Sequence, residues 1–166
     1  MTAQDRLQRL AVAYLQGPRQ SAPGSGSLSS LPESDAAFTE LMQLMPFAGR
    51  VGIVLDAADR DAVRGRLAWA PELCTGDGVL HGGALMTLAD SVGAICAYLN
   101  LPSAGRTSTI SSSTTFLRAA RGGEVTATGQ PLHVGRSVIV VQTDLKDERG
   151  RLIAQTTQAQ AVLAGG

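Results

Sequence analysis

The segment Gly82–Leu99 constrains the fold of this chain more than any other part of its sequence. It reads GGALMTLADSVGAICAYL, and Asp90 is its only charged residue. Apolar side chains fall all round its helical wheel, so the pattern predicts a helix without an obvious water-facing side. Other elements must therefore wrap this helix on all sides, because its apolar surface has to leave water.

The remainder of the chain after Pro46 favours strands around that helix. Alternating apolar residues and separating turns predict strands over Arg50–Ala57, Ala62–Trp69, Arg106–Leu117, Gly123–Val134, Ser137–Lys146 and Arg151–Leu163. The first two form a predicted hairpin, and the last four form a predicted antiparallel meander. The order favours an α+β fold in which one curled antiparallel sheet wraps a long central helix.

The sequence of the N-terminal part predicts an extension that precedes the main domain. Helical spacing of apolar residues predicts a short amphipathic helix within residues 1–16. Residues 17–33 are rich in Gly, Ser and Pro and indicate a flexible linker, which leaves 34–166 as the main domain. A further helix is predicted over Ala36–Met45, closed by Pro46.

Composition excludes several classes of function. The formal net charge is +0, whereas nucleic-acid binding usually requires a basic excess. A membrane span is disfavoured because Asp90 falls near the middle of the apolar segment. Cys74 and Cys96 cannot form a disulfide framework, so we expect reduced thiols in a cytoplasmic protein without a secretory signal. No Cys/His cluster has metal-site spacing, so we expect no metal.

Three features at and within the predicted helix point to acyl chemistry. An ionised carboxylate is rarely buried without a partner, so Asp90 among apolar residues suggests a chemical role. His81, Gly82 and Gly83 stand at the start of the helix, where free backbone N–H groups point outward. These N–H groups suit the negative charge that develops on a carbonyl oxygen during acyl transfer.

The motifs HGGALMTLAD, FLRAARGG (116–123), HVGRS (133–137) and GRLIAQTTQAQ (150–160) resemble the PaaI-like branch of the hotdog-fold acyl-CoA thioesterases. The resemblance covers about Pro46 to Leu163. It implies that Asp90 attacks the thioester or activates water and that the Gly82 N–H polarises the carbonyl. It also implies that His81 helps to hold this part of the site and that Thr109 orients the attacking water.

The resemblance also implies a substrate and an assembly. Coenzyme A is expected to contact a set of residues from three segments, namely Gly83, Arg118, Gly135, Arg136 and Ser137. Coenzyme A enters as part of the substrate, and no other cofactor is expected. Relatives of this kind form homodimers, often paired as dimers of dimers.

One position departs from the pattern of this branch. Many relatives have an Asn six residues before the histidine, where this chain has Thr75. A branch similar to 4-hydroxybenzoyl-CoA thioesterases places Glu and Thr where this chain has Asp90 and Ala94, so the PaaI-like branch fits better.

The spacing of Gly82 and Asp90 predicts a site formed by two chains. The two residues are eight positions apart, which is about 12 Å along one helix. Both groups have to lie within about 3 Å of the reacting atoms or the attacking water. One chain cannot easily supply both, so we expect Gly82 from one chain and Asp90 from its partner.

Several alternatives stay open at this point. Asp90 is a structural acid if Ser91, Thr87 or an arginine satisfies it, and His81 merely caps the helix if its side chain turns inward. The domain is a non-catalytic acyl-CoA-binding module if hydrolysis fails. A hotdog hydratase fits poorly, because His81 precedes Asp90. The acyl group, aromatic or medium-chain aliphatic, is not fixed by the sequence.

Overall fold

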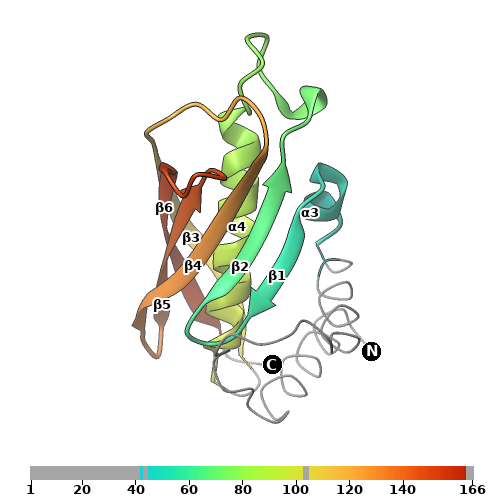
Figure 1. The fold of residues 1–166 in the computed structure, drawn as a ribbon. Coiled ribbons are helices and arrows are strands. Elements are labelled where there is room, and N and C mark those ends of the chain that lie inside the picture. The colour runs from blue at the N-terminus through green and yellow to red at the C-terminus, as the bar shows by residue number, and fades with distance from the viewer. Residues whose placement is uncertain (1–41, 43–44, 103–104, 164–166) are drawn as a thin grey trace, which may run out of the picture.

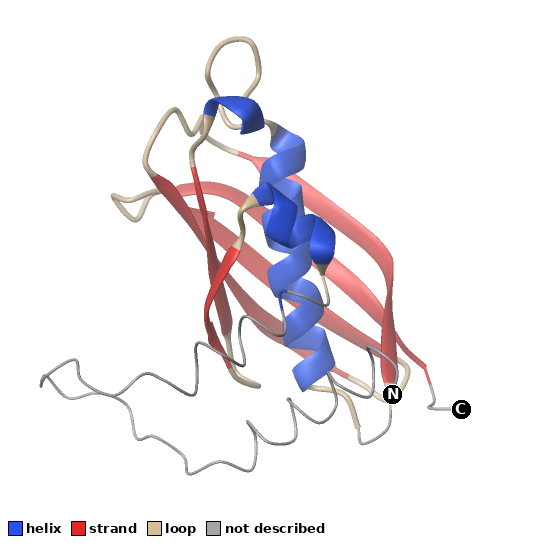
Figure 2. Ribbon diagram, turned by 90° about the vertical axis from the view of Figure 1, so that its right-hand side faces the viewer, coloured by secondary structure: helices blue, strands red, loops and turns tan. Residues whose placement is uncertain are grey.

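The computed structural model describes residue 42 and residues 45–102 and 105–163. These residues form a six-stranded antiparallel sheet curled around one long helix, as Figures 1 and 2 show. The predicted α+β fold is thereby confirmed. The predicted helix within residues 1–16, the linker and most of the helix over Ala36–Met45 lie outside the described residues.

The described elements follow one another in a simple order. They are α3 (Pro46–Val51), β1 (Val54–Ala58), β2 (Val63–Ala68), a 3-10 turn η1 (Pro71–Leu73), α4 (Gly82–Leu99), β3 (Arg106–Phe116), β4 (Glu124–Val134), β5 (Val138–Lys146) and β6 (Leu152–Leu163). In space the strands lie in the order β1-β2-β4-β5-β6-β3.

Helix α4 has the predicted bounds and forms the centre of the core. Leu88 and Val92 are fully buried against strand residues such as Val141 and Leu145, which are also fully buried. The helix is long and apolar enough to cross a membrane by length and composition, with a mean hydropathy of 1.3. Most of it is buried inside the curled sheet, which is the environment that its composition requires here.

The predicted meander of four strands is wrong in one respect. Strands β4, β5 and β6 follow one another as expected, but β3 pairs with β6 at the edge of the sheet, and β4 pairs with β2. Hydroxyl residues occupy both faces of β3, and nearly all of them are exposed, so this strand suits an edge. The residues of β4 that face the helix, such as Val125 and Ala127, are buried, so this strand takes an interior place.

The start of the first predicted strand is also wrong. Arg50 and Val51 belong to helix α3, and the strand begins at Val54. Met42 is helical and Met45 is not, so a helix does end before Pro46, but Pro46 also begins a new one, since proline fits the first helical turn, where no N–H partner is needed. Gly52, with φ of +86°, ends the helix in the left-handed conformation.

The described residues do not cover helix α4 on all sides, contrary to the sequence prediction. Gly83, Met86 and Asp90 are exposed, and their spacing places them along one stripe of the helix. We call these three residues the open stripe. Asp90 is therefore exposed in the single chain, although its carboxylate still reaches Gln158 of β6.

Candidate active site

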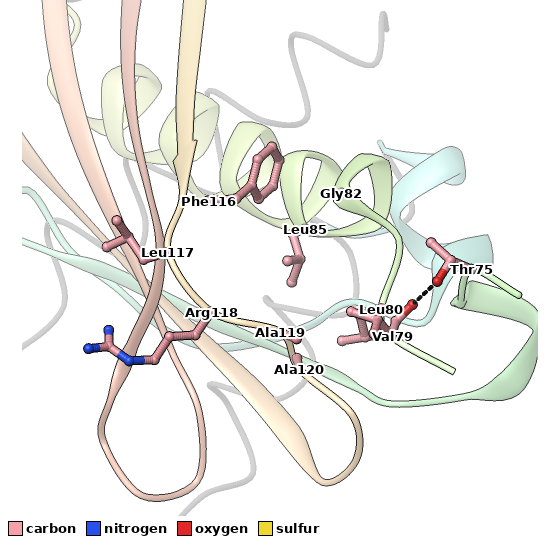
Figure 3. A pocket seen from close by; sticks show the side chains of 10 residues that line it. All are labelled: Thr75, Val79, Leu80, Gly82, Leu85, Phe116, Leu117, Arg118, Ala119 and Ala120. Atoms are coloured by element: carbon pink, nitrogen blue, oxygen red, sulfur yellow. Dashed lines mark hydrogen bonds between the residues drawn. The ribbon is translucent and has the colours of Figure 1, made fainter. Parts of the chain in front are cut away.

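A pocket of about 490 Å³ opens beside the start of helix α4 (Figure 3). Its lining is mainly apolar, with Thr75 and Arg118 as its polar side chains. The lining consists of Thr75, Val79, Leu80, Gly82, Leu85, Phe116, Leu117, Arg118, Ala119 and Ala120. It combines the loop before the helix, the first turn of the helix and the segment that leaves β3.

The backbone N–H of Gly82 is the free donor at this pocket. Gly82 is the first residue of α4, and no hydrogen bond from its N–H is found among the described residues. The ring of Phe116 lies so close that a Cβ on Gly82 would come within 3.1 Å of its Cζ atom. A glycine here therefore leaves room for the ring and exposes an unpaired amide to the pocket.

His81 is the N-cap of α4, which was one of the two alternatives for this residue. Its Nδ1 accepts a hydrogen bond from the Gly83 N–H at 2.8 Å. The Gly83 amide is thus occupied by the cap. The backbone carbonyl of His81 accepts from Ala84 and Leu85, so His81 organises the first turn around the free Gly82 amide.

Thr75 lies in a short loop that backbone hydrogen bonds hold against the rest of the site. Its N–H donates to the Val79 carbonyl at 2.8 Å, and its hydroxyl points to the same oxygen at 3.4 Å. Trp69 Nε1 donates to the Gly78 carbonyl at 3.1 Å and fixes the tip of this loop. The Thr75 side chain therefore lines the pocket as a hydroxyl without the reach of an amide (Figure 3).

The predicted coenzyme A contacts fall at two ends of the molecule. Arg118 lines the pocket, where one of its nitrogens donates to the Leu152 carbonyl at 2.6 Å. The turn that contains Gly135, Arg136 and Ser137 lies at the other end of the sheet, where Ser137 accepts a hydrogen bond from Val162. Strand β3 has eleven residues and runs between these two ends of the molecule, so the ends are about 33 Å apart.

Asp90 lies on the open stripe, two turns along α4 from Gly82, and is absent from the lining of the pocket. Gln158 Nε2 donates to its Oδ1 at 2.5 Å. Partial burial against the apolar helix and sheet raises the pKa of the Asp90 carboxyl, and the hydrogen bond from Gln158 opposes this rise. The polar partner of Asp90 is thus the side-chain amide of Gln158, and not Ser91, Thr87 or an arginine.

Thr109 joins Asp90 in one polar cluster. Its Oγ1 accepts from Gln160 Nε2 at 2.9 Å and from Gln158 Nε2 at 3.3 Å. Gln158 therefore contacts both of the residues that were expected to act on the attacking water. Sequence reasoning missed Gln158 and Phe116, although Gln158 lies within the GRLIAQTTQAQ motif at a position whose side chain faces the helix.

The single chain divides the predicted residues between two places. Thr75, His81, Gly82 and Arg118 lie at or beside the pocket, whereas Asp90 and Thr109 lie further along α4 and β3. This division agrees with the separation expected from the helix length. Within the described part of the chain, no group of three or more His, Cys, Asp and Glu side chains is arranged to hold a metal ion.

Comparisons with known proteins agree with this fold. Residues 77–154 match the sequence model of the Thioesterase superfamily. A Pseudomonas aeruginosa protein that is named as an esterase is 30% identical to this chain over 118 residues, which cover 69% of this chain and 81% of that protein. The crystal structure of a thioesterase from Haemophilus influenzae superposes with a TM-score of 0.72 at 26% identity, covering 76% of this chain and 90% of the other.

Other relatives are matched over less of their length. The 1,4-dihydroxy-2-naphthoyl-CoA hydrolase of Escherichia coli is 35% identical over 86 residues, 52% of this chain and 63% of that protein. A Vibrio cholerae protein with an esterase name is matched over 57% of its length. On the strength of the family match and the Pseudomonas relative, the chain belongs to the thioesterase superfamily and has its hotdog fold.

The capping role of His81 gives a first prediction. His81→Ala removes the acceptor for the Gly83 N–H and is expected to lower the free energy of unfolding by about 0.5–2 kcal/mol. His81→Asn keeps an acceptor at the cap and should retain most of that stability. Urea unfolding at a fixed protein concentration measures both, and equal stability of His81→Ala and the wild type would show that the cap contributes nothing.

Proposed function

We propose that this protein hydrolyses acyl-CoA thioesters to the free acid and coenzyme A, at a site that two chains form together. The observation that carries the proposal is the placement of two complementary groups on one helix. A free amide at Gly82 faces an apolar pocket, and the Asp90 carboxylate stands exposed two turns further on. Two such chains side by side would supply an oxyanion donor and a base to one thioester.

The chemistry follows from the properties of these groups. With Asp90 as general base, the carboxylate takes a proton from water while the oxygen attacks the thioester carbonyl carbon. The Gly82 N–H, at the positive end of the α4 dipole, stabilises the resulting oxyanion. Collapse breaks the C–S bond, and the proton on Asp90 passes to the leaving sulfur. If Asp90 instead attacks directly, an anhydride forms as the C–S bond breaks and coenzyme A leaves as the thiolate, and water then cleaves the anhydride to the free acid and the Asp90 carboxylate.

Strand β3 is the surface through which we propose that two chains pair. It is an edge strand of eleven residues with no charged residue between Thr107 and Phe116. Natural edge strands are usually protected by charges or proline, so an unprotected edge of this length favours pairing with another strand. Ile110, 60% exposed, lies at a bulge in this strand and would be covered by such pairing.

The proposed shared site implies one register for the pairing of the two β3 strands. Asp90 lies level with residues 109–112 of β3, because its partner Gln158 pairs with Ser112 and contacts Thr109. Gly82 lies level with Phe116. Antiparallel pairing inverts the order along the partner strand, so a twofold axis near Ser113 would bring the partner's Asp90 level with Gly82.

The remaining predicted residues fit supporting roles in this arrangement. Arg118 at the pocket mouth would attract a coenzyme A phosphate, and Arg136 would do so only from the partner chain, because it lies at the far end of its own sheet. Thr75 offers a hydroxyl near the carbonyl. No metal or redox group takes part in this chemistry. Pairing of two dimers would complete the tetramer expected from the resemblance.

The acyl group is proposed from the lining of the pocket. Leu85, Leu117 and the half-exposed ring of Phe116 offer apolar and aromatic contacts, which suit a ring or a medium chain. The Escherichia coli relative is named for a naphthoyl-CoA substrate, so we expect aromatic acyl-CoAs to be the better substrates. Binding of acyl-CoA without release of thiol would favour the alternative of a non-catalytic binding module.

Two variants test the chemistry at single atoms. Gly82→Pro removes the N–H at the first helical position, where proline is tolerated, and adds a ring whose Cβ meets Phe116; His81 already has the extended conformation that precedes proline. Loss of one oxyanion donor is expected to lower kcat about 100- to 1000-fold. Asp90→Asn removes the base and is expected to lower kcat by about 100-fold or more.

The control for the first variant is Gly82→Ala, which adds a Cβ beside Phe116 but keeps the N–H. Thiol release from benzoyl-CoA and octanoyl-CoA measures all three variants, with circular dichroism to check the fold. If Gly82→Ala and Gly82→Pro lose the same activity, the amide has no catalytic role. If Asp90→Asn hydrolyses at the wild-type rate, Asp90 is not the base.

The proposed register predicts where a cross-link forms between two chains. Each of Ser111, Ser112, Ser113, Thr114 and Thr115 is replaced by Cys in turn, and oxidation is expected to be most efficient for Ser113→Cys. Residues opposite each other in antiparallel strands are about 4.5–5.5 Å apart, within the range of a disulfide. Ser108→Cys, on the same strand but far from the proposed axis, is the control. A dimer that cross-links at none of the five positions would refute this interface.

A further inference from the structure

We propose that Gln158 is a positioning residue for the proposed hydrolysis: its buried amide holds Asp90 as the carboxylate and ties it to Thr109. This inference rests on the proposed function, since it assigns Asp90 to the reaction. It goes beyond that function because it places part of the catalytic behaviour in strand β6, which contributes no residue to the pocket.

The position of Gln158 is unusual for a polar side chain. The residue is fully buried at the centre of β6, between the sheet and α4. Its Nε2 donates to Asp90 at 2.5 Å and approaches Thr109 Oγ1 at 3.3 Å. One side-chain nitrogen therefore bridges the helix and the edge strand at the place where the proposed base and the water-orienting hydroxyl meet.

The other end of the amide shows why its orientation is fixed. Gln158 Oε1 is buried without a hydrogen-bond partner among the described residues. It lies over Gly93, where a Cβ would come within 2.2 Å of it. A buried acceptor without a partner is costly, so the amide would turn round if that improved its hydrogen bonding. An ionised carboxylate only accepts hydrogen bonds, so Asp90 requires Nε2 in its present place.

The charged residues of the surrounding elements do not explain the state of Asp90. Strand β6 carries no ionisable residue, and β3 carries only Arg106 at its far end. On helix α3 and the other strands that pack against α4, none of the ionisable residues is buried; they are Arg50, Asp56, Arg64, Arg66, Glu124, His133, Asp144 and Lys146. Burial and the Gln158 hydrogen bond are thus the forces that act on the carboxyl.

The same cluster determines how Thr109 can act. Its Oγ1 accepts hydrogen bonds from both Gln158 and Gln160, which fills the two acceptor positions of a hydroxyl. Gln160 is in turn fixed by the Thr107 hydroxyl, which donates to its Oε1 at 2.8 Å. The Thr109 proton is left to point outward as a donor, which suits the oxygen of an attacking water beside Asp90.

Gln158→Met tests the inference, because methionine keeps the length of the side chain and removes the amide. A hydrogen bond to a charged group corresponds to a pKa shift of about 1–2 units. We therefore expect the pKa of Asp90 to rise by about that amount, and the acidic limb of kcat/KM to move to higher pH equally. Gln158→Glu keeps the shape of the side chain and adds a charge of the same sign as that of Asp90. It should therefore also raise the pKa of Asp90 and move the acidic limb of kcat/KM to higher pH.

Gln160→Met is the matched control, since Gln160 is the same residue type, two positions along the same strand, and equally buried. It contacts Thr109 but not Asp90, so the pKa of Asp90 and the acidic limb should stay where they are in the wild type. A purely structural role for Gln158 would lower activity or stability in both variants without moving the limb in either.

The titration of the Asp90 carboxyl carbon by NMR is measured alongside thiol release, because it does not depend on turnover. An unchanged Asp90 pKa in Gln158→Met and Gln158→Glu would overturn the inference. A shift in both variants without a shift in Gln160→Met supports it. If wild-type protein releases no thiol but the titration shifts, the contact between Gln158 and Asp90 is supported, and it is the proposed function that fails.

Discussion

The rigid length of helix α4 is the constraint on which the rest of the site depends. Its first residue carries the free amide, and its ninth carries the carboxylate, so the backbone itself holds them about 12 Å apart. No side-chain rearrangement within one chain removes that separation. The proposed chemistry therefore requires association of two chains. The described part of the chain leaves uncovered the open stripe of Gly83, Met86 and Asp90 and the edge strand β3.

The buried polar residues of the core lie on the side of α4 that serves this site. Gln158, Gln160, Thr143 and Thr156 are almost completely buried on β5 and β6, where apolar residues would pack at lower cost. Thr143 Oγ1 and Gln158 Oε1 have no hydrogen-bond partner within the described part of the chain. Such unsatisfied groups reduce stability, and in natural proteins they concentrate at functional sites. Here Gln158 bridges Asp90 and Thr109, and its unsatisfied Oε1 and the unsatisfied Oγ1 of Thr143 lie beside the same residue, Gly93.

Most of the fold could be predicted from the periodicity of apolar residues. The errors of that prediction have physical causes. The bounds of α4 followed from an apolar run that ends at Asn100, and the strand positions followed from alternation. The place of β3 could not be predicted, because the order of strands depends on which faces are buried and not on which strands are consecutive. The predicted start of β1 was wrong because Arg50 and Val51 fit the alternation of a strand, whereas they belong to the short helix α3 that begins at Pro46.

The candidate site could be predicted in its residues but not in their connections. The roles expected of Gly82 and Asp90 came from the helix start and the lone charge, and their separation came from counting residues. The cap made by His81 and the bridge made by Gln158 depend on side-chain directions, which no spacing in the sequence encodes. The residues expected to contact coenzyme A were predicted as one set drawn from three segments. In the structure, two members of this set, Arg118 and Arg136, lie at opposite ends of the sheet.

The most direct test of a site shared by two chains is complementation. Asp90→Asn and Gly82→Pro chains with different affinity tags are co-expressed, and the mixed dimer is purified through both tags. Each parent dimer should be inactive. A mixed dimer contains one site with both groups intact, so about half of the wild-type thiol release is expected. A mixed dimer as inactive as its parents would show that Gly82 and Asp90 act within one chain, and would contradict this account.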